Sequence, residues 1–323
     1  MERNLLVSVI IPAYNAEKTI KRCVDSCLMQ TYPNIEIVVV DDGSSDGTAD
    51  FVKALPDYGT KIILIQSENK GVSSARNIGI ENCSGSLISF LDADDTLDCN
   101  AVQTMFDLMS ENNSDIAVCC NKNVYKDKIS ENHFLQDFYL WEGTASLEES
   151  LKDNPATYSS CSKLYSKDFI GDTRFEVGQR IHEDSFFLFK LFMKQPVVAV
   201  KDIALYNYYA TENSASHSVY DDRILDILDF AEEKRKLIYT EYPQFGKLAE
   251  NVKIKADIAY LYFCFGQNVK GVKDIEKQCI KEIKELKKSY IPLMKYGNLM
   301  FFIVTHNLYF TAKRVFAFRR KLK

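Results

Sequence analysis

Short apolar runs alternate with amphipathic segments along the first third of the chain. Four runs rich in β-branched residues predict buried strands, at 6–11, 35–40, 62–66 and 87–91. Between them, apolar residues recur with helical spacing in three segments, at 17–30, 48–55 and 71–80. Because strands that alternate with helices favour right-handed βαβ crossovers, we predict an α/β fold with a mostly parallel central sheet flanked by helices.

The alternation continues more loosely toward residue 218 and then stops. The predicted elements are a helix at 100–110, a strand at 115–120, an irregular polar stretch at 125–154, a strand at 160–165, a helix at 183–194, and strands at 197–200 and 204–209. Beyond them the spacing is helical throughout, at 222–239, 247–267, 274–288 and 299–319. We therefore divide the chain into an α/β domain at 1–218 and a helical C-terminal region at 219–323.

Composition supports a globular protein and argues against several other classes. Of the 323 residues, 46% are hydrophobic and 26% are charged, which allows a sizeable core. A net charge of -5 argues against a nucleic-acid-binding protein. Nine cysteines without paired Cys-x-x-Cys spacing indicate reduced thiols and argue against a zinc site. Since the sequence has neither an apolar stretch of membrane-spanning length nor a signal-peptide pattern, we expect a cytoplasmic protein.

Three carboxylates, Asp92, Asp94 and Asp95, follow the predicted strand at 87–91. In open α/β sheets, ligands gather at the carboxyl ends of strands. Asp92 and Asp94 are two residues apart, so an extended backbone would direct both side chains to the same side. Their oxygens suit Mg²⁺ or Mn²⁺, which usually completes its coordination with substrate phosphates. The alternative is an acidic turn that caps the next helix, because Asp is a good N-cap residue.

Polar clusters also follow the first and second strands, at 13–15 and 41–47. A carboxylate such as Asp42 can accept a hydrogen bond from a nucleobase imide or a ribose hydroxyl. The chain has neither the Gly-x-Gly-x-x-Gly pattern nor a P-loop, which weakens a dinucleotide-binding interpretation. If a nucleoside diphosphate binds here, a metal at Asp94 and a cation such as Arg76 must hold it. For Arg76, the alternative is a solvated helix face.

Another pair of carboxylates, Glu183 and Asp184, stands at the start of a predicted helix. Transfer of a sugar to a hydroxyl requires removal of the hydroxyl proton, and a positioned Asp can act as that general base. The alternative is structural, because carboxylates stabilise the N-terminus of a helix.

Four of these segments together resemble the family 2 glycosyltransferases with the GT-A fold, of the bacterial surface-polysaccharide type. They are the opening strand and loop at 7–15, the second strand end at 39–48, the segment at 69–77 and the acidic strand end at 90–95. The segments at 162–165 and 183–184 resemble later and less specific motifs of the family. The order and spacing of the four fit the family, and the resemblance fades after about residue 218.

The resemblance implies a nucleotide-sugar donor, most often a UDP-sugar. The donor-binding residues that it implies are Pro12, Tyr14, Asn15, Asp41, Asp42, Arg76, Asp92 and Ala93. Among these, Asp42 would accept from the uracil imide, and Arg76 would lie near the base and the diphosphate.

The resemblance also implies a divalent metal and a catalytic base. The cofactor would be Mn²⁺ or Mg²⁺, with Asp94, Asp92 and a later histidine as ligands, and His217 is the candidate histidine. Asp184 would be the base, and Glu183 would support the acceptor. Transfer would proceed with inversion of configuration at the sugar.

The sequence therefore predicts a metal-dependent inverting glycosyltransferase that moves a hexose or N-acetylhexosamine to a hydroxyl of a glycan or lipid-linked acceptor in bacterial surface polysaccharide synthesis. Two alternatives stay open. A nucleotidyltransferase acting on sugar phosphates would also use carboxylates and a metal, but it usually has a Gly-rich basic N-terminal loop, which this chain lacks. A non-catalytic nucleotide-sugar-binding module could share the fold without needing both Asp94 and Asp184.

The C-terminal tail is both apolar and basic. Residues 280–323 contain 11 Lys and Arg against two Glu, whereas the rest of the chain is acidic. The apolar segments at 299–304 and 308–310 are too short to span a bilayer. A basic amphipathic helix would lie on an anionic membrane surface, so we expect peripheral contact with the inner face of the cell membrane. The equally weighted alternative is a terminal helix packed on the body of the protein.

Overall fold

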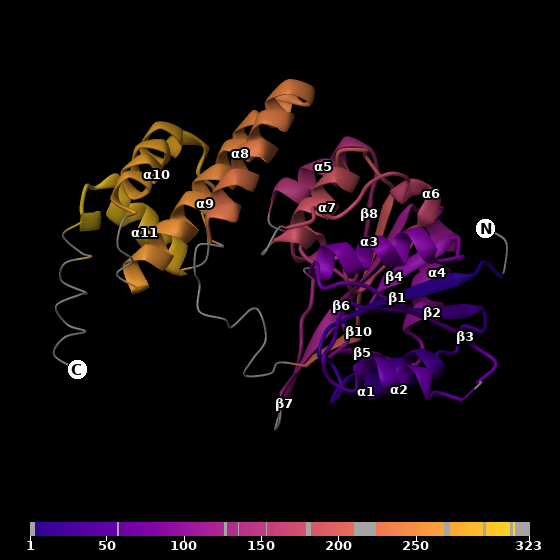
Figure 1. Cartoon of the computed structure of the whole chain (residues 1–323). Helices are drawn as coiled ribbons and strands as arrows, with labels where there is room; N and C mark the ends of the chain where they lie inside the picture. The colour runs from indigo at the N-terminus through magenta and orange to yellow at the C-terminus, as the bar shows by residue number, and fades with distance from the viewer. Residues whose placement is uncertain are drawn as a thin grey trace. The chain divides into compact units, whose positions relative to one another are not determined.

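Figure 1 shows a computed structural model of the chain. The structure describes residues 4–56, 58–125, 128–134, 136–152, 154–178, 182–209, 224–267, 272–292, 295–310 and 313. The chain divides into two compact units, Met1–Ser218 and Val219–Lys323. The first unit contains the sheet, and the described part of the second unit is helical.

The first unit is built on a mixed sheet whose strand order, over the described residues, is β3-β2-β1-β4-β9-β6-β10-β5, with β7 on β6 and β8 on β10. The strands on one side, β3 to β4, pair in parallel, which confirms the predicted crossovers, whereas β9 runs antiparallel to both β4 and β6. The strands are β1 (Val7–Ala13), β2 (Ile35–Asp41), β3 (Lys61–Gln66), β4 (Leu87–Phe90), β5 (Thr96–Leu97), β6 (Ile116–Tyr125), β7 (Lys128–Glu131), β8 (Phe138–Trp141), β9 (Lys163–Ser166) and β10 (Val198–Tyr209).

Helices pack on this sheet mostly through apolar side chains, although the buried face of α3 also carries Ser73, Ser74 and Arg76. Helix α3 lies along β1 and β2 (Figure 1). Helix α4 packs on β6, β9 and β10. The helices of this unit are α1 (Ile20–Leu28), α2 (Thr48–Lys53), α3 (Val72–Asn82), α4 (Ala101–Asn112), α5 (Thr144–Leu151), α6 (Lys167–Ile170) and α7 (Glu183–Phe192), with a 3₁₀ turn at Pro155–Thr157.

An aromatic cluster connects α7 to the end of β4. The rings of Phe175 and Phe187 stack with centroids 3.9 Å apart. Phe90, the last residue of β4, meets both rings edge-on at 5.3 and 6.1 Å. Because Phe187 lies one helical turn after Glu183, this packing brings the first turn of α7 to the carboxyl end of β4.

Two differences from the sequence pattern concern the strands beyond β5. We expected an irregular stretch at 125–154, but β7, β8 and α5 form there. β7 is mostly polar and exposed, whereas β8 is the short aromatic run Phe138–Trp141. Pairing with β6 and β10 holds both strands in the extended conformation. The separate strands expected at 197–200 and 204–209 form one strand, β10, with register shifts after Val200.

In the second unit, α8, α10 and α11 pack against the central helix α9. The elements are α8 (Ile224–Glu241), a 3₁₀ turn at Pro243–Phe245, α9 (Gly246–Gln267), α10 (Lys273–Leu286), a 3₁₀ turn at Lys287–Ser289, and α11 (Lys295–Thr305). The core includes Ile258 and Leu261 of α9, Ile283 of α10, and Met300 and Val304 of α11. The last helix was expected at 299–319. Helix α11 begins earlier and ends at Thr305, residues 309, 310 and 313 are helical again, and most of the basic tail lies outside the described residues.

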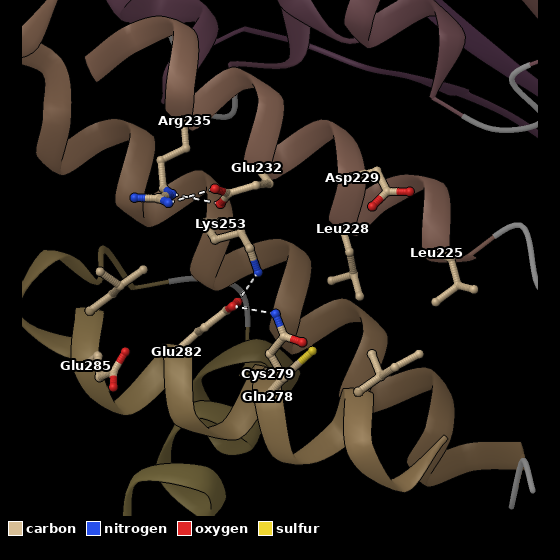
Figure 2. A pocket seen from close by; sticks show the side chains of 12 residues that line it. Leu225, Leu228, Asp229, Glu232, Arg235, Lys253, Gln278, Cys279, Glu282 and Glu285 are labelled. Carbon is tan, nitrogen blue, oxygen red and sulfur yellow. Dashed lines mark hydrogen bonds and ion pairs between the residues drawn. The ribbon is translucent and has the colours of Figure 1, made fainter. Parts of the chain in front are cut away.

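A charged pocket of about 540 Å³ opens between α8 and α10 over α9. Figure 2 shows the amine of Lys253 directed at Glu282, and Arg235 paired with Glu232. Lys253 is only 6% exposed, and it also forms an ion pair with the fully buried Asp257. Both cationic side chains of the pocket, Arg235 and Lys253, are therefore paired with carboxylates of this unit. The residues that line the pocket are Leu225, Leu228, Asp229, Glu232, Arg235, Lys253, Ile275, Gln278, Cys279, Glu282, Glu285 and Leu286.

Replacement of Lys253 by Met is expected to destabilise the second unit by about 3 kcal/mol or more, because it leaves buried carboxylate charge uncompensated. Amide hydrogen exchange in α9 would measure the loss. Lys247→Met, at an exposed position of the same helix, is the matched control. Trp141, the single tryptophan, lies in the first unit and its fluorescence should not change. Equal protection in both variants would contradict a compensating role for Lys253.

Candidate active site

The residues after β4 form a turn. We expected extended backbone through Asp92 and Asp94, and this was wrong: β4 ends at Phe90, and the Asp95 N–H donates to the Asp92 carbonyl at 3.0 Å. The turn is held from outside, because the guanidinium of Arg22 donates to the Asp94 carbonyl and lies 3.7 Å from the centre of the Tyr209 ring. Asp92 and Asp94 are both half-buried in this turn.

Asp95 anchors the turn to β10. Its side chain is 1% exposed and accepts hydrogen bonds from the Tyr206 hydroxyl at 2.6 Å and the Tyr209 N–H at 2.8 Å. Burial raises the pKa of this carboxyl to about 8, although the Tyr206 hydrogen bond opposes that shift. Asp95 is thus a structural member of the acidic strand end.

Asp92 and Asp94 are the carboxylates that the sequence predicts to hold a divalent cation, and that assignment stays a prediction. Burial and the charge of Asp92 raise the pKa of Asp94, so a nearby cation would be stabilising. Two carboxylates joined by substrate phosphates are a donor set that Mg²⁺ commonly takes. Within the described residues no group of three or more His, Cys, Asp and Glu side chains forms a ready metal site. The third predicted ligand, His217, lies outside those residues.

Arg76 connects the two acidic sites that the sequence predicted separately. It lies in α3, is 3% exposed, and donates from Nη2 to Asp92 Oδ1 at 2.9 Å. Its Nη1 donates to Asp184 Oδ1 at 2.7 Å and to Glu183 Oε1 at 3.2 Å. The solvated helix face considered above therefore does not apply. The expected place of Arg76 beside the base and diphosphate stays a prediction.

Asp184 is held by more than the guanidinium. Its Oδ1 accepts from the Ser160 hydroxyl at 2.8 Å, and its Oδ2 accepts from the Ser160 N–H at 3.1 Å and the Ser159 hydroxyl at 3.3 Å. Asp184 also lies in the first turn of α7, where its charge stabilises the helix N-terminus, and these hydrogen bonds come in addition to that structural role. Burial and the neighbouring Asp184 charge raise the pKa of Glu183.

The acidic pair after β2 is engaged by protein donors. Asp42 is buried and accepts from the N–H groups of Lys70 at 2.9 Å and Gly71 at 2.8 Å, which ties the end of β2 to the start of α3. Asp41 accepts from the Ser44 N–H at 3.1 Å and the Gln66 amide at 3.3 Å. A carboxylate oxygen has a second lone pair, so the contact of Asp42 with uracil stays a prediction.

The loops after β1 and β2 are hydrogen-bonded to each other and form one rim. The Asn15 N–H donates to the Ser44 hydroxyl, and the Ser45 N–H donates to Asn15 Oδ1, each at 2.9 Å. Tyr14 is 54% exposed on this rim, which suits a ring that stacks on a base. Two further predicted donor residues, Pro12 and Ala93, are buried in β1 and in the turn after β4.

Comparison with known proteins decides the family. The model of glycosyl transferase family 2 matches residues 8–173, just over half of the chain. The chain belongs to glycosyltransferase family 2. The matched residues include the rim formed by the loops after β1 and β2, as well as Arg76 and the turn after β4. The match ends before Glu183 and Asp184.

Relatives of this glycosyltransferase include two proteins of Streptococcus pneumoniae serotype 4. Glycosyltransferase GlyA is 32% identical over 243 residues, and the match covers 72% of this chain but only 34% of GlyA. Glycosyltransferase GlyG is 28% identical over 230 residues, covering 67% of this chain and 74% of GlyG. This chain thus spans about a third of the length of GlyA.

The solved structures include a close match to the fold of this glycosyltransferase. The crystal structure of Staphylococcus aureus TarS residues 1–349 in complex with UDP-GlcNAc superposes with a TM-score of 0.70 at 20% identity. The match covers 99% of this chain and 93% of that one. The GT-A fold expected from the sequence is therefore confirmed.

Sequence reasoning missed several residues that shape the site of this glycosyltransferase. Ser159 and Ser160 hydrogen-bond to Asp184, and their only signal in the sequence is their place just before the segment at 162–165. Arg22 supports the Asp94 carbonyl from α1, and a lone arginine on a helix carries no pattern that would reveal this. Both contacts depend on long-range packing.

Lys163 lies buried behind this site in β9. Burial lowers its pKa to about 8, although nearby thiol and carboxylate groups oppose the shift. An unfolded lysine keeps its ordinary pKa of 10.5, so the unfolded chain binds more protons above about pH 8. We therefore expect wild-type stability, relative to Lys163→Met, to rise by about 2 kcal/mol between about pH 7 and about pH 9.5. Urea unfolding followed by Trp141 fluorescence would measure it, and a pH-independent difference would contradict the burial argument.

Proposed function

We propose that this chain is a metal-dependent inverting glycosyltransferase that uses a nucleotide-sugar, specifically a UDP-hexose or UDP-N-acetylhexosamine. The single observation that carries the proposal is the cluster around Arg76. There the acidic strand end and the first turn of α7 meet within ion-pair distance of one guanidinium, although Asp92 and Asp184 are far apart in the sequence. Inverting transfer needs a diphosphate-binding site and a base side by side, and the proximity of these carboxylates to one guanidinium supports that arrangement.

In the proposed reaction, the acceptor hydroxyl loses its proton to a carboxylate oxygen of Asp184, and one of the four hydrogen bonds that this carboxylate accepts from Arg76, Ser159 and Ser160 opens to make room for it. The acceptor oxygen bonds to the anomeric carbon from the face opposite the diphosphate, and the bond to the diphosphate oxygen breaks with its electron pair. The Asp184 side chain is 19% exposed, so an acceptor can reach it. Arg76 keeps Asp184 and Asp92 in fixed relative positions while these bonds change.

Asp94 and Asp92 would hold the Mn²⁺ or Mg²⁺ ion. When bound, the ion supplies positive charge that stabilises the leaving diphosphate. His217 is kept in the proposal as a third ligand on the resemblance alone. Pro12, Tyr14, Asn15, Asp41, Asp42 and Ala93 would form the nucleoside side of the site.

The relatives support the donor class and the pathway. TarS was crystallised with UDP-GlcNAc and with UDP, and a chondroitin synthase of Escherichia coli is 35% identical over 141 residues. We infer transfer to a glycan or lipid-linked hydroxyl in bacterial surface polysaccharide synthesis. Family membership favours this over a nucleotidyltransferase, and the presence of both Asp94 and Asp184 favours it over a non-catalytic module.

A donor screen tests the proposal. UDP release would be measured from UDP-glucose, UDP-galactose, UDP-N-acetylglucosamine and UDP-N-acetylgalactosamine, with Mn²⁺, Mg²⁺ or EDTA, and GDP-mannose as the nucleotide control. Metal-dependent release from one UDP-sugar, with an inverted anomeric product by NMR, is the expected result. Formation of a nucleotide-sugar from UTP and a sugar phosphate would instead identify a nucleotidyltransferase, and no turnover of any donor would favour a binding module.

We also propose that the tail contacts an anionic membrane surface from the cytoplasm. In the described part of the chain, no helix has the length and apolar character to cross a bilayer. Helix α11 and the residues after it pack Met300, Val304 and Tyr309 into the helical core. They nevertheless leave large apolar side chains exposed, at Leu299, Phe302, Leu308 and Phe310. These side chains, next to the basic tail, suit an interfacial helix.

Loss of tail charge is expected to weaken flotation with liposomes that contain anionic lipid. Because α11 is part of the core, substitution is cleaner than truncation, and the test variant replaces with Gln the basic residues Arg314, Arg319, Arg320, Lys321 and Lys323. The full chain should float at low salt and the variant should not. Equal flotation of the two, or none by the full chain, would rule out the tail as an anchor.

A further inference from the structure

The hydroxyl groups next to Asp184 have fixed directions. The Ser159 hydroxyl oxygen accepts a hydrogen bond from the Cys161 N–H at 3.1 Å, so the hydroxyl hydrogen is available to donate to Asp184 Oδ2. Ser160 donates both its hydroxyl and its N–H to the same carboxylate and is fully buried. Three donors from two consecutive residues thus surround a carboxylate that also contacts Arg76.

Two side chains of β9 hold this pair of serines from behind. The Lys163 ammonium donates to the Ser159 carbonyl at 2.6 Å, and the Tyr165 hydroxyl donates to the Ser160 carbonyl at 2.8 Å. Lys163 and Tyr165 are both buried in the sheet between β4 and β6. Burial of the Lys163 ammonium without a carboxylate next to it costs free energy. Stability of the fold alone therefore explains poorly why a lysine occupies this position.

We propose that Ser160 is a positioning residue for Asp184, and that Lys163 and Tyr165 act on Asp184 through the Ser159–Ser160 pair. Arg76 contacts the Asp184 carboxylate from α3, and Ser159 and Ser160 contact it from the segment just before β9. Together the three residues restrict this carboxylate to one orientation. A base must point at the acceptor oxygen within a fraction of an ångström to act efficiently. This inference rests on the proposed role of Asp184 as the base.

The test compares Ser160→Ala, Ser160→Thr and Tyr165→Phe with wild type. UDP release from UDP-N-acetylglucosamine with water as acceptor gives kcat and KM, and calorimetry gives the affinity for UDP with Mn²⁺. Ser160→Ala should lower kcat by about 10-fold or more, since it removes a hydrogen bond to a charged group. Ser160→Thr, which keeps the hydroxyl, should retain most of the wild-type kcat, and Tyr165→Phe should lower kcat by about 3-fold to 10-fold. KM and UDP affinity should stay unchanged.

Two matched variants separate positioning from general loss of stability. Tyr32→Phe removes a buried hydroxyl that donates to the Leu5 carbonyl at 2.6 Å, as Tyr165→Phe does near Asp184. Ser146→Ala removes a buried serine hydroxyl that donates to the Gly143 carbonyl at 2.7 Å. Both should keep wild-type kcat. A fall in kcat in the controls equal to that in Tyr165→Phe and Ser160→Ala would overturn the proposal.

Crystal structures decide the inference even if UDP-N-acetylglucosamine is not turned over. The distance from Asp184 Oδ1 to Arg76 Nη1 is 2.7 Å, and it should lengthen or become variable in Ser160→Ala and Tyr165→Phe but not in Tyr32→Phe. An unchanged carboxylate in both variants would overturn the positioning role. Absence of turnover by wild type, with the carboxylate displaced as expected, would count against the donor alone.

Discussion

Replacement of Asp94 by Ala is expected to lower UDP release by about 10³-fold or more, because metal stabilisation of a leaving diphosphate contributes several kcal/mol to the transition state. The fold should not suffer. Burial and the Asp92 charge raise the pKa of this carboxyl, so its ionised form is unfavourable without a cation and its removal relieves that repulsion. Steady-state UDP release with Mn²⁺ measures the loss of turnover, and thermal unfolding followed by Trp141 fluorescence measures the stability of the variant.

The matched control for Asp94→Ala is Asp107→Ala, on the exposed surface of α4, which should keep wild-type rates and stability. Added Mn²⁺ should raise the unfolding temperature of wild type in the presence of UDP, and this increase should be lost in Asp94→Ala. Undiminished turnover of the variant, or of wild type in excess EDTA, would refute the metal assignment.

Replacement of Asp184 by Asn is expected to lower turnover by about 10²-fold or more, because an amide cannot take the acceptor proton. Part of the loss has a structural origin. Whichever way the amide is turned, its NH₂ group faces either the Arg76 guanidinium or the Ser160 N–H, both of which are donors. We expect this mismatch to cost about 1–3 kcal/mol of stability, which urea unfolding would measure.

Affinity for UDP with Mn²⁺ separates the proposed base from a donor ligand. If Asp184 is the base, calorimetry should give nearly the same UDP affinity for Asp184→Asn and wild type. A collapse of UDP affinity together with turnover would instead make Asp184 part of the donor site. Wild-type turnover in Asp184→Asn would mean that another group removes the acceptor proton.

The sequence was sufficient for the frame of this enzyme. Buried strands read as apolar runs, their spacing by helices predicted crossovers, and crossovers place strand ends on one rim. The sequence therefore predicts that the polar clusters after β1, β2 and β4 lie on the same edge of the sheet, and the parallel pairing of these strands agrees with that placement. The resemblance of four segments to glycosyltransferase family 2 then predicted glycosyl transfer as the reaction. The family is confirmed by the match over residues 8–173.

The sequence could not assign the partners within that site. Arg76 could have been a solvated helix residue, and Asp184 could have been a helix cap. Stacking of Phe187 on Phe175, with Phe90 against both, is what brings α7 to the end of β4 and Arg76 to Asp184. Hydrophobic periodicity shows that each of these rings is buried, but it does not show against which partner.

Local backbone at the acidic strand end was likewise decided by distant groups. Asp92 and Asp94 follow a strand, and the pattern alone predicts that the extended conformation continues. The structure has a turn because Asp95 is drawn to Tyr206 and Tyr209 of β10, more than a hundred residues later in the chain. The sequence by itself determined which elements form and which ends meet. Tertiary packing alone decided the direction of each carboxylate, because hydrogen-bond partners distant in the chain carry no local signal.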